Sequence, residues 1–177
     1  MKKAIINFFD RNFFPDQTVN SVFEIDYDAF YTAGVRGVIF DIDNTLATFD
    51  VEKPCEKTTA FLRGLVEKGF KVGFLSNNSK KRVKLFNEDL GYPSIWRAKK
   101  PRLYGLWTLT KMMGLTRKKV ILVGDQIFTD CWVGNRAGIY TILTKRVADR
   151  DEWQVKLKRV PEKIIMHTYK RSGYGDN

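Results

Sequence analysis

Short apolar runs alternate with amphipathic segments along the chain from residue 35 onward. Short apolar runs between turn residues are typical of buried strands, and the predicted strands are 35–40, 71–75, 94–96, 119–123 and 139–143. Apolar residues at helical spacing between these runs predict helices, over 56–68, 79–90, 101–114 and 130–137. Because connections of this length are too long for hairpins, the strands are expected to pair in parallel.

The helix predicted over 101–114 has marked ends and an apolar face. Pro101 and Gly114 bracket it, as expected for a proline in the first turn and a glycine past the last. Its predicted buried side chains are Leu103, Leu106, Trp107 and Leu109.

This pattern predicts an α/β fold with a parallel sheet covered on both faces, because parallel strands with long apolar runs are buried on both sides. Right-handed crossovers make such a sheet a three-layer, Rossmann-like, doubly wound domain. Residues 35–144 form the predicted core. Residues 1–34 are predicted to be an N-terminal amphipathic appendage. Residues 145–177 are predicted to be a basic C-terminal tail on or beyond the core, with a helix over 153–157 or 162–169.

Composition excludes several classes of protein. A single histidine, His167, and two distant cysteines, Cys55 and Cys131, argue against a histidine-rich zinc site, a CxxC redox pair and a disulfide framework. No run of about 18 apolar residues is present to span a bilayer. The N-terminus starts like a signal peptide, but Asp10 and Arg11 interrupt it before a long apolar stretch. We therefore expect a cytoplasmic location, which allows peripheral binding at the inner face of the membrane.

The charge of the chain is concentrated in one stretch. The net charge is +11, and residues 80–119 hold 12 basic and 2 acidic side chains. Such an excess is compatible with binding to nucleic acid, anionic lipid or phosphorylated substrates. It is equally compatible with a solvated helix face, so charge alone leaves the partner open.

Polar residues of a particular kind follow four of the predicted strands. In doubly wound sheets, ligands bind beyond the carboxyl ends of the strands, and the polar residues found there are Asp41, Asp43, Ser76, Asn77, Lys99, Lys100, Asp125 and Asp130. Four carboxylates without a histidine favour a hard cation with oxygen ligands, and Mg²⁺ is the expected cofactor.

Each of these residue types has a role in phosphoryl transfer. A carboxylate can attack phosphorus to form an aspartyl-phosphate, and a second carboxylate can protonate the leaving oxygen and then activate water. A lysine and a divalent cation neutralise the charge of the phosphoryl group. A hydroxyl and backbone N–H groups bind its oxygens.

The segments FDIDNTL, FLSNN, AKKP and VGDQIFTD occur in this order after successive predicted strands. They resemble motifs I to IV of the haloacid dehalogenase-like (HAD) phosphohydrolases, over about residues 35–143. FDIDNTL together with GDQIFTD and the following GNRAG is similar to the YqeG-type phosphatases of subclass IIIA, a group related to mitochondrial phosphatidylglycerophosphatases.

The resemblance implies catalytic roles for four residues. Asp41 would be the nucleophile, Asp43 the general acid and base, Ser76 a hydrogen-bond partner of the phosphoryl group, and Lys100 the motif III lysine. Asn77 joins Asp41, Ser76 and Lys100 in the predicted phosphate-binding set. Lys99 is adjacent to Lys100 and competes for the lysine role.

The resemblance also implies a metal site and supporting residues. Mg²⁺ would be bound by the carboxylates of Asp41 and Asp125 and by the backbone carbonyl of Asp43. Asp130 would hold metal-bound waters or orient the lysine. Asn44, where many relatives have glycine, and Thr45 support the loop after the nucleophile.

Purely structural roles are the alternatives for four of these residues. Asp41 and Asp43 could be a solvated pair in a loop or an N-cap. Ser76 could serve only as the cap of the helix that follows it, and Asp130 could be the N-cap of the helix that begins at Cys131.

The spacing of the motifs bears on the substrate. Only 34 residues separate Asp41 from Ser76, and 23 separate Ser76 from Lys100. Family cap domains are inserted at these two places, and neither gap has room for a full cap. An open, capless or minimally capped site would admit a bulky phosphorylated substrate.

The predicted function is therefore a Mg²⁺-dependent phosphomonoester hydrolase, and the resemblance points to phosphatidylglycerophosphate. The alternative is a nucleic-acid- or ribosome-associated protein, or a polynucleotide end phosphatase, that uses the basic surface. Ile5, Ile6, Phe9 and Phe13 form one helical face that could lie on an anionic membrane or pack on the protein itself or a partner chain.

Overall fold

A computed structural model of the chain describes residues 8, 9, 11–147, 165 and 169. They contain one sheet of six parallel strands in the order β1-β6-β5-β2-β3-β4. The strands are β1 (Gln17–Val19), β2 (Gly37–Phe40), β3 (Lys71–Leu75), β4 (Ser94–Ile95), β5 (Val120–Gly124) and β6 (Tyr140–Thr144). This order confirms the predicted doubly wound α/β fold.

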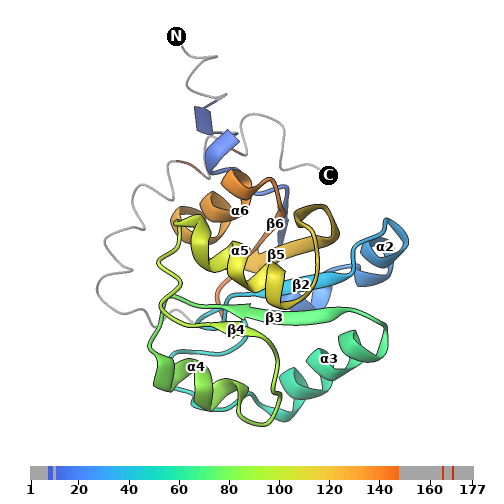
Figure 1. The fold of residues 1–177 in the computed structure, drawn as a ribbon, viewed down its shortest axis with the longest axis vertical. Helices are drawn as coiled ribbons and strands as arrows, with labels where there is room; N and C mark the ends of the chain where they lie inside the picture. The colour runs from blue at the N-terminus through green and yellow to red at the C-terminus, as the bar shows by residue number, and fades with distance from the viewer. Residues whose placement is uncertain (1–7, 10, 148–164, 166–168, 170–177) are drawn as a thin grey trace.

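Helices cover both faces of the sheet (Figure 1). They are α2 (Tyr27–Thr32), α3 (Glu56–Glu67), α4 (Lys80–Asn87), α5 (Leu103–Met112) and α6 (Trp132–Ala137), with short turns η1 (Val22–Glu24), η2 (Arg117–Lys119) and the π-helical η3 (Ile127–Cys131). The alternation of side chains along β2 shows the two layers. Val38 and Phe40 pack with α3 and α4, whereas Ile39 packs with α5 and α6.

The chain path places a switch point between β2 and β5. From β2 the chain runs outward through β3 to β4 on one side, then returns to β5 and β6 on the other. Loops from neighbouring strands diverge at such a point and leave a crevice at the carboxyl edge, where ligands bind in this kind of sheet. β3 points to the left in Figure 1, so the carboxyl edge is the left-hand side of that view.

The sixth strand was missed by the sequence prediction. The apolar pattern predicts no strand before residue 35, and this was wrong, because β1 pairs with β6 at the edge of the sheet. β1 is only three residues long and has no apolar run. Its start is held by Asp16, whose carboxylate accepts hydrogen bonds from the backbone N–H of Thr141 at 2.7 Å and from its hydroxyl at 3.0 Å. Part of the predicted appendage therefore belongs to the sheet.

The N-terminal segment packs on the domain itself. Phe13 and Phe14 are buried in a cluster with Ile127 of η3, Ile165 and Tyr169. The self-packing interpretation is thus confirmed for Phe13, whereas Ile5 and Ile6 lie outside the described residues. Most of the predicted tail, including the helix over 153–157, also lies outside them.

Other predictions changed in detail. Strand limits moved by one or two residues, and the helix predicted over 130–137 begins at Trp132, after the π-helical turn. Leu106 and Leu109 are buried as predicted, but Trp107 is 57% exposed, so its predicted burial was wrong. Within the described residues, no helix has the length and apolar character that crossing a membrane requires.

Candidate active site

The candidate active site is built at the carboxyl ends of β2 and β5, on either side of the switch point. Asp41 directly follows β2, and its backbone N–H donates to the carbonyl of Val123 in β5 at 2.9 Å. Asp125 directly follows β5. Because these strands are hydrogen-bonded neighbours, the two carboxylates lie side by side at the carboxyl edge of the sheet.

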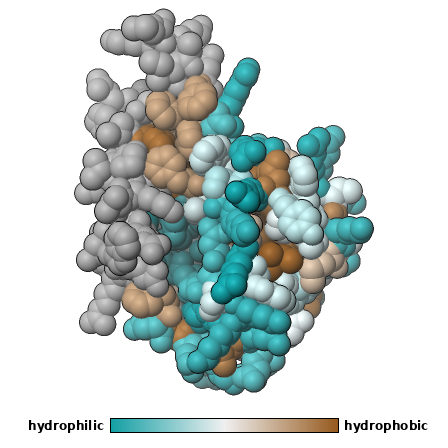
Figure 2. All heavy atoms as spheres, turned by 60° about the vertical axis from the view of Figure 1, so that its left-hand side comes forward, coloured by the Kyte–Doolittle hydropathy of each residue, from teal (hydrophilic) through white to brown (hydrophobic). Residues whose placement is uncertain are grey.

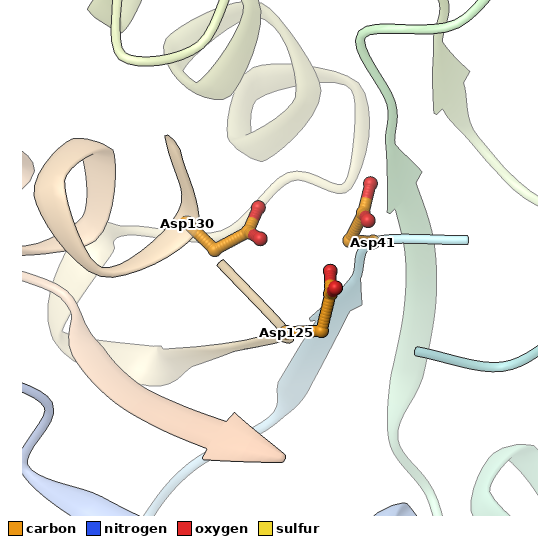
Figure 3. A group of neighbouring side chains, drawn as sticks. All are labelled: Asp41, Asp125 and Asp130. Carbon is orange, nitrogen blue, oxygen red and sulfur yellow. The ribbon is translucent and has the colours of Figure 1, made fainter. Parts of the chain in front are cut away.

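A third carboxylate joins them from the π-helical turn. Asp41, Asp125 and Asp130 are all buried, and each offers an oxygen within 4.8 Å of the others. Figure 3 shows the three side chains turned toward one another from separate segments. The close approach requires glycine at position 124, since a Cβ there would collide with the Asp130 carboxylate.

Lys100 inserts its ammonium group between two of these carboxylates. Nζ donates to Oδ1 of Asp41 at 2.7 Å and to Oδ1 of Asp130 at 2.6 Å. Burial on its own would lower the pKa of Lys100, but Asp130 and Asp41 outweigh it and the pKa is raised. The raised pKa of Lys100 favours its charged form beside Asp41 and Asp130. Lys99, its competitor in the sequence, is exposed.

The loop that carries Lys100 is tied to the loop after β3. The side-chain amide of Asn77 accepts from the backbone N–H of Lys100 at 2.7 Å and donates to the Lys100 carbonyl at 3.2 Å. The N–H of Ala98 donates to the carbonyl of Ser76 at 2.9 Å. Asn77, predicted to bind phosphate, thus positions the lysine in this structure.

The structure does not show the helix-capping roles that were the alternatives for Ser76 and Asp130. The N-cap of α4 is Ser79, whose side chain accepts from the N–H of Arg82, so Ser76 does not cap that helix. Ser76 is buried, and its hydroxyl accepts from the N–H of Asn78 at 3.0 Å. The helix after Asp130 has no side-chain cap. Oδ2 of Asp130 accepts from the N–H of Gln126 instead, at 3.1 Å.

Asp43 is held apart from the three clustered carboxylates. Its Oδ1 accepts from Nε of Arg82 at 2.9 Å, and its Oδ2 accepts from the Asn78 amide at 3.1 Å. Arg82 is itself buried and also donates to the carbonyls of Glu52 and Thr48. The carboxylate predicted to be the acid and base is therefore held in a fixed orientation two residues after Asp41.

Arg82 is a site residue that the sequence reasoning missed. It was counted only within the basic stretch of residues 80–119. One signal was available, because residues four apart share a helix face and the apolar Phe86 lies four positions later in the sequence.

Arg146 was missed as well. Its Nε donates to Oδ2 of Asp125 at 3.0 Å. It lies two residues beyond the end of β6, and the rule that chemistry gathers just after each strand would have included it.

Several buried oxygens at this edge have no hydrogen-bond partner. Among the described residues they are Oδ1 of Asn44, Oγ1 of Thr45, Oδ1 of Asp125 and Oγ1 of Thr144. Buried polar atoms are normally paired. These atoms follow β2 and β5 or end β6, so the unmet capacity lies around the carboxylates. Asn44 has φ of 64°, a left-handed conformation that asparagine tolerates better than most residues.

The electrostatics of the three clustered carboxylates favour the binding of a cation. Burial raises the pKa of Asp41 to about 7, with Lys100 opposing this rise and Asp130 and Asp43 adding to it. Burial also raises the pKa of Asp125 well above its usual value, with Asp41 and Asp130 adding to the rise. A divalent cation would remove this cost and pair the free Oδ1 of Asp125. The residues present therefore fit a metal ion.

A curated relative decides the family. The chain is 36% identical to the probable phosphatase YqeG of Bacillus subtilis over 162 residues, which are 92% of this chain and 94% of that protein. The HAD-hydrolase-like family profile matches residues 98–169. The chain belongs to the HAD-like phosphatases.

Further proteins that are similar to this HAD-like phosphatase are also named as phosphatases. The chain is 28% identical over 178 residues to the phosphatidylglycerophosphate phosphatase 1, chloroplastic/mitochondrial, of Arabidopsis thaliana, which covers 93% of this chain and 50% of that protein. Among solved structures, a HAD phosphatase from Thermococcus onnurineus aligns with a TM-score of 0.54 at 15% identity, over 72% of this chain and 98% of that one. The cobalt-bound YrbI phosphatase of Haemophilus influenzae aligns with a TM-score of 0.51 at 14% identity, over 81% and 94%. These two structures support the fold alone.

Proposed function

We propose that this HAD-like phosphatase hydrolyses phosphomonoesters through an aspartyl-phosphate on Asp41, with Mg²⁺ as its metal. The observation that carries the proposal is the ion pair between the buried ammonium of Lys100 and the Asp41 carboxylate, at 2.7 Å. A carboxylate and a phosphate dianion repel each other, and a fixed cation between them removes much of that barrier. Asp130, 2.6 Å from the same ammonium, keeps it in place.

In the first step, a carboxylate oxygen of Asp41 attacks phosphorus, and the bond from phosphorus to the alcohol oxygen breaks. Asp43 gives a proton to that oxygen, so the alcohol leaves neutral. In the second step, Asp43 takes a proton from water, whose oxygen attacks phosphorus and releases inorganic phosphate. The Asp41 carboxylate is regenerated, so the two steps balance.

Supporting residues orient these groups. The hydroxyls of Ser76 and Thr45 lie at the same edge and are proposed to donate to phosphoryl oxygens. Asp41, Asp125 and the backbone carbonyl of Asp43 are the proposed metal ligands. When bound, the metal supplies positive charge that stabilises the phosphoryl group.

We further propose a lipid phosphomonoester of the phosphatidylglycerophosphate type as the substrate. Two curated relatives are named as phosphatidylglycerophosphate phosphatases. The site also has no inserted cap domain, because the described chain between β2 and β3 contains only a loop and α3. A phosphorylated lipid with a large headgroup can therefore reach the carboxyl edge of the sheet.

The test is a phosphate-release assay with the purified full chain and Mg²⁺. The panel contains phosphatidylglycerophosphate, glycerol 3-phosphate, a 5′-phosphorylated oligonucleotide and a phosphopeptide. The proposal expects turnover of the lipid and its loss in Asp41→Asn. Preference for the oligonucleotide would instead select the polynucleotide end phosphatase, and turnover of soluble phosphates without the lipid would reject the lipid assignment.

A further inference from the structure

Exposed apolar side chains stand on several segments that follow the strands of the proposed active site. They stand on segments that follow three different strands: Phe49 and Val51 after β2, Trp96 and Tyr104 after β4, and Val147 after β6. Parallel strands share one carboxyl edge, so the segments that carry these side chains all leave the sheet at that edge. Tyr104 is 80% exposed and lies four residues from Lys100. Packing in the core does not account for the exposed part of these apolar side chains.

Hydrogen bonds and ring contacts tie these segments to the site. The backbone N–H of Val147 donates to the carbonyl of Asn44 at 2.9 Å, which joins the segment after β6 to the loop of the nucleophile. Lys80 lies above the ring of Trp96, with Nζ 5.0 Å from the centroid. We call the five exposed apolar residues on these segments the rim.

Exposed cations accompany the rim on the β4 side. They are Lys80, Arg97, Lys99 and Arg102. In the part of the chain that the structure describes, Arg97, Lys99 and Arg102 have no ion-pair partner. The exposed acidic side chains Asp50 and Glu52 lie on the segment after β2, next to Phe49 and Val51 in the sequence. Figure 2 brings this side of the molecule forward and shows hydrophilic residues over much of it, with hydrophobic residues between them.

We infer that the rim is a docking surface for an anionic lipid bilayer, an inference that rests on the proposed function. Aromatic side chains with lysine and arginine are the combination that membrane–water interfaces favour. Lys100 and Asp41 are buried at the carboxyl edge of the sheet, so a lipid phosphate has to approach this edge to reach them. Binding of the rim and its cations to the headgroup layer would bring the lipid phosphate to this edge.

The chemistry of the rim favours a bilayer over a nucleic acid. Single-stranded nucleic acids stack their bases on aromatic rings, and two of the five rim residues, Val51 and Val147, are aliphatic. An acyl-chain boundary accepts aliphatic and aromatic side chains alike. A bilayer therefore uses the whole rim, whereas a strand of RNA would use only part of it.

The test is co-sedimentation of the full chain with two kinds of vesicle, phosphatidylcholine alone and phosphatidylcholine mixed with phosphatidylglycerol. The expected result is at least tenfold tighter binding to the anionic vesicles. The double variants Phe49→Ser/Tyr104→Ser and Arg97→Gln/Arg102→Gln should each weaken that binding tenfold or more. The control Val66→Ser/Met112→Ser removes apolar side chains of similar exposure from the ends of α3 and α5 that point away from the site, and should leave it unchanged.

The same samples are assayed with p-nitrophenyl phosphate, which needs no bilayer. Hydrolysis by the wild type without vesicle binding would overturn the docking surface and leave the proposed phosphatase function intact. Vesicle binding without hydrolysis of any phosphate would instead reject the proposed function. Tight binding of a 20-nucleotide RNA that depends on the same residues, with no vesicle binding, would also overturn the inference.

Discussion

Arg82 donates from Nε to Oδ1 of Asp43 at 2.9 Å, and this ion pair is largely buried. The guanidinium is held on its other side by the carbonyls of Glu52 and Thr48, at 3.0 and 3.3 Å. Arg82 therefore connects α4 to the loop after the nucleophile. Its position fixes the carboxylate that is proposed to protonate the leaving group.

We expect Arg82→Gln to lower the hydrolysis of alkyl phosphates much more than that of aryl phosphates. General acid catalysis is worth about 10²- to 10⁴-fold, and it matters most when the leaving alcohol is a weak acid. The measurement compares kcat/KM for glycerol 3-phosphate with that for p-nitrophenyl phosphate on the same sample, so any unfolded fraction cancels. Lys81→Gln, on the adjacent exposed residue, is the control. Equal losses on both substrates would reduce Arg82 to a structural role.

Lys100→Met should abolish most activity and also destabilise the fold. The substitution keeps the length of the side chain but leaves Asp41 and Asp130 facing each other without the ammonium that lies 2.7 and 2.6 Å from them. Loss of one partner from a buried ion pair costs about 3–5 kcal/mol. Urea denaturation and phosphate release measure the two effects.

Lys99→Met is the matched comparison for this change, because Lys99 is adjacent but exposed. It should cost far less in both stability and activity than Lys100→Met. A larger loss from Lys99→Met would exchange the roles of the two lysines.

Asp125→Asn should weaken stabilisation by Mg²⁺. Oδ1 of Asp125 is buried without a partner, whereas Oδ2 is held by Arg146 at 3.0 Å, which leaves one oxygen for a cation. A ligand at 100 times its Kd stabilises the folded state by about 2.7 kcal/mol. Thermal unfolding with Mg²⁺ and with EDTA should therefore show a raised Tm for the wild type and a much smaller rise for the variant.

Asp28→Asn serves as the control for this experiment, since Asp28 is an exposed carboxylate paired with Lys68 far from the site. Its Mg²⁺-dependent rise in Tm should equal that of the wild type. An undiminished rise in Asp125→Asn would place the metal elsewhere.

The sequence pattern was sufficient for the central strands and for most of the candidate site. Strands β2, β3 and β5 are buried apolar runs, and the polar residues after them are recognisable because little else interrupts the pattern. What the pattern could not supply depends on contacts between distant segments. β1 is a strand because Asp16 and β6 hold it, and no local periodicity in Gln17–Val19 encodes that pairing.

Arg82 shows a related limit at the site. A basic residue in a basic stretch is expected to face solvent, and only the fold shows that Arg82 turns inward to Asp43. The choice between Lys99 and Lys100 was likewise open in the sequence. It depends on the turn after β4, which Asn77 holds through both backbone groups of Lys100.

Gly124→Ala should displace Asp130 and thereby disturb the lysine that Asp130 holds. A Cβ at position 124 would collide with the Asp130 carboxylate, and overpacking of this kind costs about 1–3 kcal/mol. Gly64→Ala is the matched control, because a Cβ there meets nothing within 4 Å and alanine favours helix α3 by about 0.5–1 kcal/mol. Thermal unfolding and phosphate release should show losses for the first variant and a slight gain in Tm at full activity for the second.

The double variant Gly124→Ala/Asp130→Gly separates collision from general strain at this strand end. It removes the whole Asp130 side chain, including the Cβ that would lie 2.5 Å from the new Cβ, so it should lose less stability than the two single variants together. Activity should stay low, because Lys100 then lacks the carboxylate 2.6 Å from its ammonium. Effects of the two substitutions that simply add would show that they do not interact, and the close packing of Gly124 against Asp130 would then not explain why glycine is needed.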